Sequence, residues 1–493
     1  MRSRDSNRWR VPAPLGLLLL AAAAGSVAAG ILVPRLSGAL PGPAVVTTIV
    51  VLALVLLAAL GALLCAGRHN LIGLPIMTAL GFLFYPLGAL TYATGQKDPS
   101  PLIPTFSEDR TARSFLLLAL LLVIAALAAW AIGYWLFRER EPATSQRSAA
   151  GAVSSVNRRR LALVVGAFTL IGALAFTRHY AARGGLYNSL ATIAQYRGSV
   201  GNTSLWSWLA LLMPEACLLW LGLDYEGARH SALFWPLFAI SFLSLLSFGN
   251  RWTPAGFLLI AALVHYQYRG VTRNTLLLAA LLGVVMLVMS LGVSVWRSLS
   301  TQGKPLVASD VARRVAAELS LQGVMGLTIW GRNMADVDLL AWIIQYYGPN
   351  NLLWGRTFLD IPLVAIPRTL WPGKPTEVGV SLFQLYSGWT GVLNAWHPGA
   401  IGELYVNAQL PGVLLGMLAL GALFARVEAW RSRHAQEPGT ALLYAVFAIK
   451  FALMTVIMGF MMPAVNFVTD FVILSLGIWF VRQPGPNKTS ERT

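Results

Sequence analysis

Long apolar stretches recur along the whole chain and are separated by polar segments, most of them short. A bilayer core about 30 Å thick is crossed by about 20 apolar residues in an α-helix. The pattern therefore predicts an all-α fold, a polytopic bundle of about twelve transmembrane helices. The predicted spans are residues 13–33, 44–66, 71–93, 115–137, 161–177, 204–223, 231–248, 254–268, 275–296, 399–424, 440–461 and 464–481.

Residues 297–398 form one large loop between predicted spans nine and ten. Two of its segments have helical character. Residues 309–320 combine capping residues with good helix formers, and residues 333–347 end at a Gly-Pro-Asn stop signal. The apolar positions of the second segment fall on one helical face, which predicts a helix lying along the membrane surface. We expect a large, partly helical loop within one membrane domain.

The composition agrees with a single integral membrane domain over residues 1–493. Hydrophobic residues make up 56% of the chain and charged residues 12%, whereas soluble domains carry about 25% charged residues. Both cysteines, Cys65 and Cys217, lie inside apolar stretches and far apart in the sequence, so neither a disulfide nor a metal site is predicted. No cofactor and no metal are expected.

The distribution of Lys and Arg predicts the orientation, because cytoplasmic loops retain positive charge. With the N-terminus inside, the inward segments carry twenty Lys and Arg and the opposite short loops carry eight. Both termini are therefore predicted in the cytoplasm and residues 297–398 in the periplasm. Topology, not nucleic-acid binding, then explains the net charge of +17. A cleaved signal peptide is the alternative for residues 13–33, but this stretch is long for one, which favours a retained helix.

Basic residues on the predicted outer side are candidates for binding an anion. Arg251 lies in the turn between spans seven and eight, and Arg332 lies in the large loop. The segment IPRTLWPGKP (366–375) carries Arg368 and Lys374 among three prolines, which prevent a regular helix and stiffen the backbone. Two interpretations stay open for these cations: simple solvation of the loop near lipid headgroups, or recognition of an anionic group.

Ionisable residues inside the predicted spans are candidates for function. Glu403 lies about one turn into the tenth span, where a carboxylate costs on the order of 2–3 kcal/mol. We expect a basic residue of the loop to be its partner, and His397 lies just before the same span. Glu215, Lys450 and Asp470 meet the same test, although Lys450 and Asp470 lie on adjacent predicted helices and are expected to pair with each other.

An ordered set of segments resembles a known family. The set comprises GNR in a short turn (249–251), a large outer loop with Arg332, IPRTLWPGKP (366–375) and PGAIGELYVNAQLPGVLLGMLALG (398–421). Over roughly residues 245–421 it resembles bacterial O-antigen polymerases, the Wzy-type oligosaccharide repeat-unit polymerases, and the N-terminal half matches only in its hydrophobic layout. The resemblance implies a glycosyltransferase of the inner membrane that joins undecaprenyl-pyrophosphate-linked repeat units on the periplasmic face without a nucleotide sugar.

The resemblance, together with the chemistry of a pyrophosphate leaving group, suggests roles for single residues. Preorganised cations would stabilise the leaving group, and a base would accept the proton of the acceptor hydroxyl. Glu403 and His397 are the candidate bases, with Asp336 behind them. The expected partners are lipid-linked donor and acceptor glycans and membrane lipid, with a chain-length regulator as a further candidate and no nucleic acid. The cations expected to bind substrate are Arg251, Arg332, Arg368 and Lys374.

Three alternatives remain open. An O-antigen ligase shares the donor and the outer-face site but transfers the glycan to a lipid A core. A flippase or other transporter of lipid-linked oligosaccharides predicts charged residues along a path through the membrane and inverted repeats. A membrane assembly partner without catalysis is the third alternative.

Overall fold

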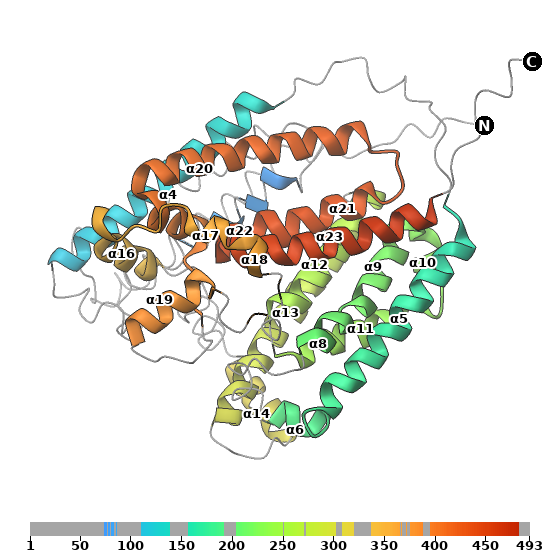
Figure 1. The fold of residues 1–493 in the computed structure, drawn as a ribbon. Helices are drawn as coiled ribbons and strands as arrows, with labels where there is room; N and C mark the ends of the chain where they lie inside the picture. Colours follow the sequence, from blue (N-terminus) through green and yellow to red (C-terminus); the bar gives the residue numbers. More distant parts are fainter. Residues whose placement is uncertain are drawn as a thin grey trace, which may run out of the picture.

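The computed structural model describes residues 110–138, 156–191, 204–249, 251–270, 273–301, 308–319, 337–364, 375–387 and 395–482, with single positions between 73 and 85 and residues 366 and 371. This part of the chain is helical and contains no strand, only an isolated bridge between Val156 and Arg482. The first two predicted spans and most of the third lie outside it. Figure 1 shows the arrangement of the helices.

The first half of the described chain consists of helices at the places where spans four to nine are predicted. Span six is broken at Leu211 into α8 and α9. The helix at predicted span nine, α13, continues five residues beyond the predicted end at residue 296. The helices are α4 (Arg110–Phe137), α5 (Arg158–Ala181), α6 (Leu186–Ala191), α8 (Ser204–Ala210), α9 (Leu212–Leu223), α10 (Tyr225–His230), α11 (Phe234–Ser247), α12 (Trp252–Arg269) and α13 (Arg273–Thr301).

The second half contains the short helices of the large loop, followed by the last three predicted spans. The short helices are separated by turns, whereas the last helices are long and nearly continuous. They are α14 (Ala308–Glu318), α16 (Val337–Tyr346), η2 (Pro349–Asn351), α17 (Arg356–Leu359), α18 (Ile361–Val364), α19 (Val378–Ser387), α20 (Gly399–Arg433), α21 (Thr440–Val446), η3 (Phe447–Leu453), α22 (Met454–Met458) and α23 (Met461–Val481).

Six segments among the described residues are long and apolar enough to cross a membrane. Large apolar side chains on them are exposed, such as Leu163 on α5 (67%) and Leu476 on α23 (60%), as expected for a surface that faces lipid. The chain is therefore a helical membrane protein. The six segments are Leu118–Phe137, Arg158–Ala181, Leu205–Leu223, Gly399–Arg433, Thr440–Met458 and Met461–Val481.

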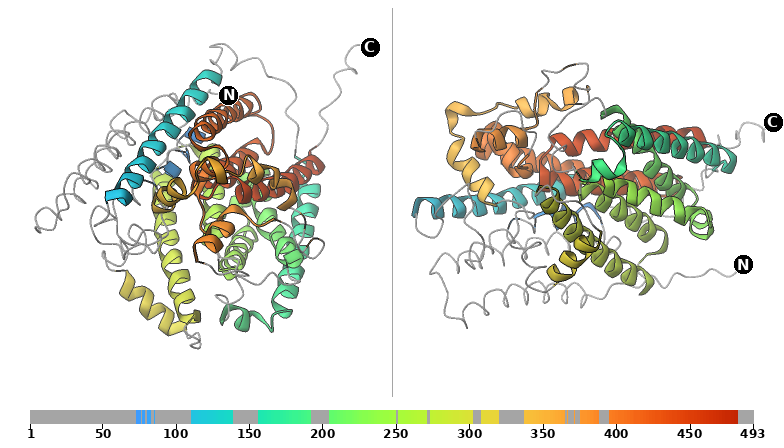
Figure 2. Two further views of the ribbon diagram at one scale, coloured as in Figure 1. Left: turned by 60° about the vertical axis from the view of Figure 1, so that its left-hand side comes forward. Right: turned by 90° about the horizontal axis from the view of Figure 1, so that it is seen from below.

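α4 and α20 pack closely through glycine. A β-carbon at Gly133 would fall on the backbone of Leu418, and one at Gly421 would fall on the backbone of Trp130. Small residues of this kind let two helix backbones approach in a membrane, where dispersion contacts drive association. Arg426 lies over the ring of Phe137, so the two helices run side by side in the same direction (Figures 1 and 2).

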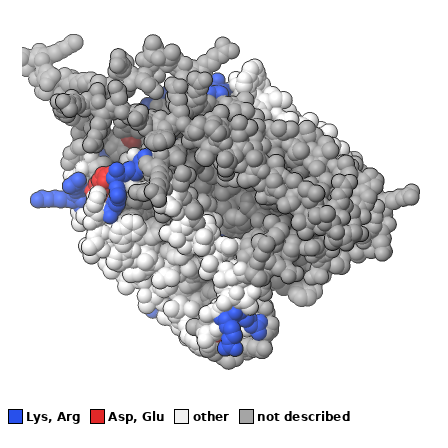
Figure 3. Space-filling view, turned by 180° about the vertical axis from the view of Figure 1, so that it is seen from behind, with Lys and Arg blue, Asp and Glu red and all other residues white. Residues whose placement is uncertain are grey.

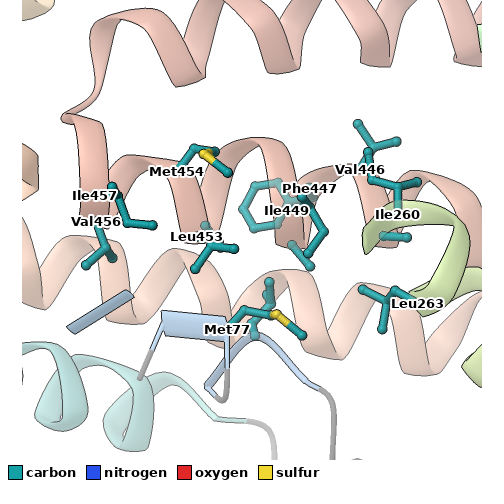
Figure 4. Close-up of a cluster of buried hydrophobic side chains, with 14 of the residues drawn as sticks. Met77, Ile260, Leu263, Val446, Phe447, Ile449, Leu453, Met454, Val456 and Ile457 are labelled. Carbon is teal, nitrogen blue, oxygen red and sulfur yellow. The ribbon is translucent and has the colours of Figure 1, made fainter. Parts of the chain in front are cut away.

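Two irregularities interrupt the last spans. Inside α20, Ala408 and Gln409 leave helical geometry just before Pro411, whose missing N–H and ring do not fit a continuous helix. The span at 440–458 contains a π-helical turn, η3, around Lys450. The buried core beside η3 joins side chains of α12, α21 and α22 with Met77, and Figure 4 shows this cluster.

Polar contacts join several chain segments at one end of the bundle, which we call the basic end (residues 156–160, 224–230, 269, 426–437 and 480–482). Arg158 lies 3.7 Å from Asp224, Arg269 lies 2.7 Å from Glu226, and Arg482 lies 3.1 Å from Glu437. In addition, the backbone N–H of Asn157 donates to the carbonyl of Val481. All of these segments are predicted from the charge distribution to lie on one side of the membrane.

The described part of the large loop lies at the other end, which we call the loop end (described residues 183–190, 247–249, 251, 294–301, 337–364, 375–387, 395–403 and 458–461). Tyr180 donates to Ser247 there, and the Trp296 indole N–H donates to the carbonyl of Leu190. In Figure 1, α16 and α19 lie on the left and α10 on the right. Figure 3 shows Lys and Arg gathered at two separate places on one face of the molecule.

The predicted surface helix in the loop is buried instead. The helix α14 lies where residues 309–320 predict it, but α16 packs against α4 and α20 inside the protein. Val337, Leu340 and Ala341 are fully buried, and so are Leu339 and Ile343 on another side of the helix. The apolar face read from the sequence is thus only part of the packed surface, because neighbours cover α16 on several sides.

Candidate functional site

Glu403 is buried at the loop end, one turn into α20, with only 1% of its surface exposed. Its Oε2 atom accepts a hydrogen bond of 2.6 Å from the backbone N–H of Phe460. Phe460 is the N-cap of α23, so the carboxylate lies at the positive end of that helix dipole. The described partner is therefore a helix N-terminus, while the basic loop residues Arg332, Arg368 and Lys374, among which the sequence suggested a partner, lie outside the described residues.

The other carboxylate oxygen of Glu403 remains available. Oε1 is buried and has no hydrogen-bond partner of good geometry among the described residues, although the Thr357 hydroxyl lies beside the carboxylate. Buried carboxylate oxygens are normally paired, and unpaired ones need an explanation such as a catalytic role. One oxygen is thus held by the backbone, and the other has the Thr357 hydroxyl as its neighbour among the described residues and can accept a proton.

Two glycines permit this arrangement. Gly459 has a φ of 98°, a conformation that other residues rarely adopt, and a β-carbon there would run into Oε2 of Glu403. Gly399 has a φ of 65°, and a β-carbon there would meet the Tyr85 hydroxyl and the carbonyl of Val456. The entry into α20 and the break between α22 and α23 can therefore approach each other only with glycine at both positions.

Asn407, one turn beyond Glu403, connects α20 to the large loop. Its Nδ2 donates to the Thr357 hydroxyl and to the carbonyl of Glu403, both at 2.7 Å. Its Oδ1 accepts from the backbone N–H of Gly355 at 2.9 Å. All three hydrogen bonds are buried or half-buried. Together they hold the loop segment that begins at Gly355 next to the Glu403 carboxylate.

His397 is placed next to a carboxylate that the sequence analysis did not single out. His397 Nδ1 lies 3.0 Å from Glu377 Oε1, and the two side chains are 31% and 15% exposed. Glu377 also acts electrostatically on Glu403. The structure therefore brings both predicted catalytic residues into one region, with Glu377 as the residue that can orient the His397 ring.

The four predicted cations are not brought together among the described residues. Arg332, Arg368 and Lys374 lie outside these residues. Arg251 lies at the loop end, where its Nη1 is 3.3 Å from the hydroxyls of both Ser290 and Ser294 on α13.

Arg356 lies between Gly355 and Thr357, the two loop residues that Asn407 binds. Its side chain is 73% exposed and lies 3.9 Å from Asp360. Because the contact is long and the arginine is exposed, the guanidinium is available to an anionic ligand.

Two aromatic side chains near the site have structural roles. Trp396 packs edge-on against Phe383, with ring centroids 5.1 Å apart, and its backbone N–H donates to Gly379. Burial is the main cause and the neighbouring Tyr346 the second cause of a raised pKa of Tyr347, so this phenol stays protonated at neutral pH.

The sequence carries a signal for some of the residues that were missed. Glu377 is the only acidic residue between Asp360 and Glu403, and it directly precedes α19. Asn407 lies four residues after Glu403, a spacing that places both on one face of a helix. Thr357 has no such signal, because its place depends on a tertiary contact with α20.

Comparison with known proteins adds no relative. No family model matches this chain. No curated protein and no solved structure matches it either.

Proposed function

We propose that this protein is a membrane glycosyltransferase that polymerises undecaprenyl-pyrophosphate-linked oligosaccharide repeat units on the periplasmic face of the inner membrane. The observation that carries the proposal is the buried Glu403 carboxylate, whose Oε1 has no hydrogen bond of good geometry among the described residues, in one region with the His397–Glu377 pair. Both predicted catalytic residues lie in the segment 396–409, which carries much of the resemblance to O-antigen polymerases.

The proposed reaction is a single displacement at the anomeric carbon of the donor glycan. A hydroxyl oxygen of the acceptor sugar forms a bond to that carbon while the bond from the carbon to the pyrophosphate oxygen breaks. The electron pair leaves with undecaprenyl pyrophosphate, and the hydroxyl proton passes to the Glu403 carboxylate. Cations beside the leaving group stabilise its developing charge, and Arg356 joins Arg251, Arg332, Arg368 and Lys374 as a candidate.

The arrangement of the chain supports a site on the outer face. Segments predicted to be cytoplasmic meet at the basic end, and Glu403 and His397 lie at the loop end. α4 and α20 run in the same direction, as spans four and ten must if the predicted order of crossings holds. With both termini in the cytoplasm, the loop end faces the periplasm, where lipid-linked repeat units are accessible.

Deletion of the gene, followed by electrophoresis of the surface glycan, tests the proposal. A polymerase leaves single repeat units on the lipid core and no ladder of longer chains. An O-antigen ligase instead leaves the core bare while long chains accumulate on undecaprenyl pyrophosphate. A flippase leaves repeat units on the cytoplasmic leaflet. Either of the last two results overturns the proposal, and an unchanged ladder overturns all three.

Variants at the second carboxylate sharpen the test. Glu377→Gln keeps the size of the side chain but removes the charge that orients His397, so chain extension should fall at least tenfold at unchanged protein abundance. Glu437→Gln, at the basic end, is the matched control and should leave the ladder unchanged. A ladder that is lost equally in both variants would indicate a general defect and contradict the assignment of Glu377.

A further inference from the structure

Three ionisable side chains meet inside the bundle, away from the loop end. Glu215, Lys450 and Asp470 lie on α9, η3 and α23, near the middle of the candidate spans Leu205–Leu223, Thr440–Met458 and Met461–Val481. Glu215 and Asp470 are 4% and 3% exposed. Charged groups at this depth are costly and mark ion or proton sites unless they are fully compensated.

The three side chains form one electrostatic group. Lys450 Nζ lies 2.8 Å from Asp470 Oδ2, which is the ion pair expected from the sequence. Glu215 interacts with both members of this pair. Because a β-carbon at Gly256 would lie 4.0 Å from Lys450 Cε, α12 also packs directly against the lysine chain.

The charges of this group do not balance when all three residues are ionised. Lys450 neutralises one carboxylate, and its contact with Asp470 assigns it to that residue. Glu215 is then left as a buried carboxylate, and its Oε2 has no hydrogen-bond partner among the described residues. In a membrane core, an uncompensated carboxylate is far less favourable than the neutral acid.

Within the described part of the chain, the surrounding helices offer no other charged group to compensate Glu215. Among the described residues, Asp470 and Lys450 are the groups that act on it electrostatically. Elsewhere on the packed helices, ionisable side chains lie toward the ends of the bundle. The Arg, His and acidic residues are Arg158, Arg159, Arg160, Arg178 and His179 on α5, Glu226, Arg229 and His230 on α10, and His265 and Arg269 on α12. The other titratable groups are one thiol and five phenols: Cys217 on α9, Tyr180 on α5, Tyr225 on α10, Tyr266 and Tyr268 on α12, and Tyr444 on α21.

We propose that Glu215, Lys450 and Asp470 form a proton-binding site in the middle of the membrane domain. The site holds one exchangeable proton on Glu215 beside the ionised Lys450–Asp470 pair. It differs from the proposed transferase site in both residues and place, so it does not depend on that function. A π-helical turn provides the lysine, in keeping with the frequent occurrence of such turns at functional positions.

Infrared spectroscopy of the purified full-length protein in lipid nanodiscs tests this proposal. The difference between the wild-type spectrum and that of Glu215→Gln should contain the carbonyl band of a protonated carboxylic acid. That band should shift in deuterium oxide and disappear as the pH is raised. Glu226→Gln, which removes an exposed carboxylate at the basic end, should instead remove carboxylate bands. Carboxylate bands in the Glu215→Gln difference at neutral pH would overturn the proposal.

Two further measurements complete the test. Replacing choline with sodium in the buffer should leave the carbonyl band unchanged, and its loss in sodium would assign the site to that ion instead of a proton. In Lys450→Met, the pair of carboxylates loses its counter-charge, and both should hold a proton. The carbonyl band should then grow about twofold, and unchanged intensity would contradict a shared site.

Discussion

Glu403 Oε2 and the backbone N–H of Phe460 form a hydrogen bond of 2.6 Å that joins the start of α20 to the start of α23. The two residues are 57 positions apart in the sequence, and the bond fixes one oxygen of a carboxylate whose other oxygen has no hydrogen bond of good geometry among the described residues. The same side chain therefore has a structural function and a proposed catalytic one, and the two can be separated by substitution.

Glu403→Gln should preserve the fold and abolish chain extension. The glutamine oxygen can still accept from Phe460, so the free energy of unfolding should change by less than about 1 kcal/mol, but the amide cannot accept a proton. Glu403→Ala should lose both functions and destabilise the protein by about 1–3 kcal/mol. Thermal denaturation in detergent and electrophoresis of the glycan measure the two effects. A normal ladder in Glu403→Gln would remove this residue from the catalytic role.

Gly459→Ala should destabilise the protein, because the added β-carbon meets the Glu403 carboxylate and the backbone has a φ of 98°. Strained conformations of this kind cost on the order of 1–3 kcal/mol. Gly166→Ala on α5 is the matched control, since a β-carbon there has no neighbour within 4 Å and alanine favours a helix. Equal melting temperatures for the two variants would show that the approach of Gly459 to Glu403 does not matter for stability.

Asn407→Asp should loosen the loop segment from Gly355 to Asp360. The carboxylate can still accept from the Gly355 N–H, but it cannot donate to the Thr357 hydroxyl or to the carbonyl of Glu403. Amide hydrogens of this segment should exchange at least tenfold faster, which corresponds to about 1.4 kcal/mol. Hydrogen exchange followed by mass spectrometry measures the effect. Segment 440–446, on α21, serves as the internal control, and faster exchange there as well would indicate general unfolding.

Removing both carboxylates around Lys450 should destabilise the bundle strongly. The double variant Glu215→Gln with Asp470→Asn leaves a buried ammonium without a counter-charge, which costs about 3–5 kcal/mol. Adding Lys450→Met should recover most of this loss, since no charge is then left in the group. Thermal denaturation of the double and triple variants measures the difference. If the triple variant is as unstable as the double one, electrostatic pairing is not what stabilises these helices.

Much of the fold follows from the local pattern of the sequence. Apolar stretches of bilayer length predict the helices α4, α5, α20 and α23, because a backbone in lipid must satisfy its hydrogen bonds internally. The Lys450–Asp470 pair is also predictable, since two charges on adjacent spans have few other partners. Boundaries were less predictable, as α20 continues to Arg433 beyond the predicted end at residue 424.

The sequence by itself determined the membrane character of this protein, the places of the described long helices and the presence of Glu403 and His397 where the large loop meets the bundle. Only the tertiary structure decided that the backbone N–H of Phe460 donates to Glu403, that Glu377 faces His397, and that α16 is buried. The physical reason is the range of the interactions. Helix formation in lipid depends on neighbouring residues, whereas a hydrogen bond to a distant backbone N–H depends on how whole helices pack.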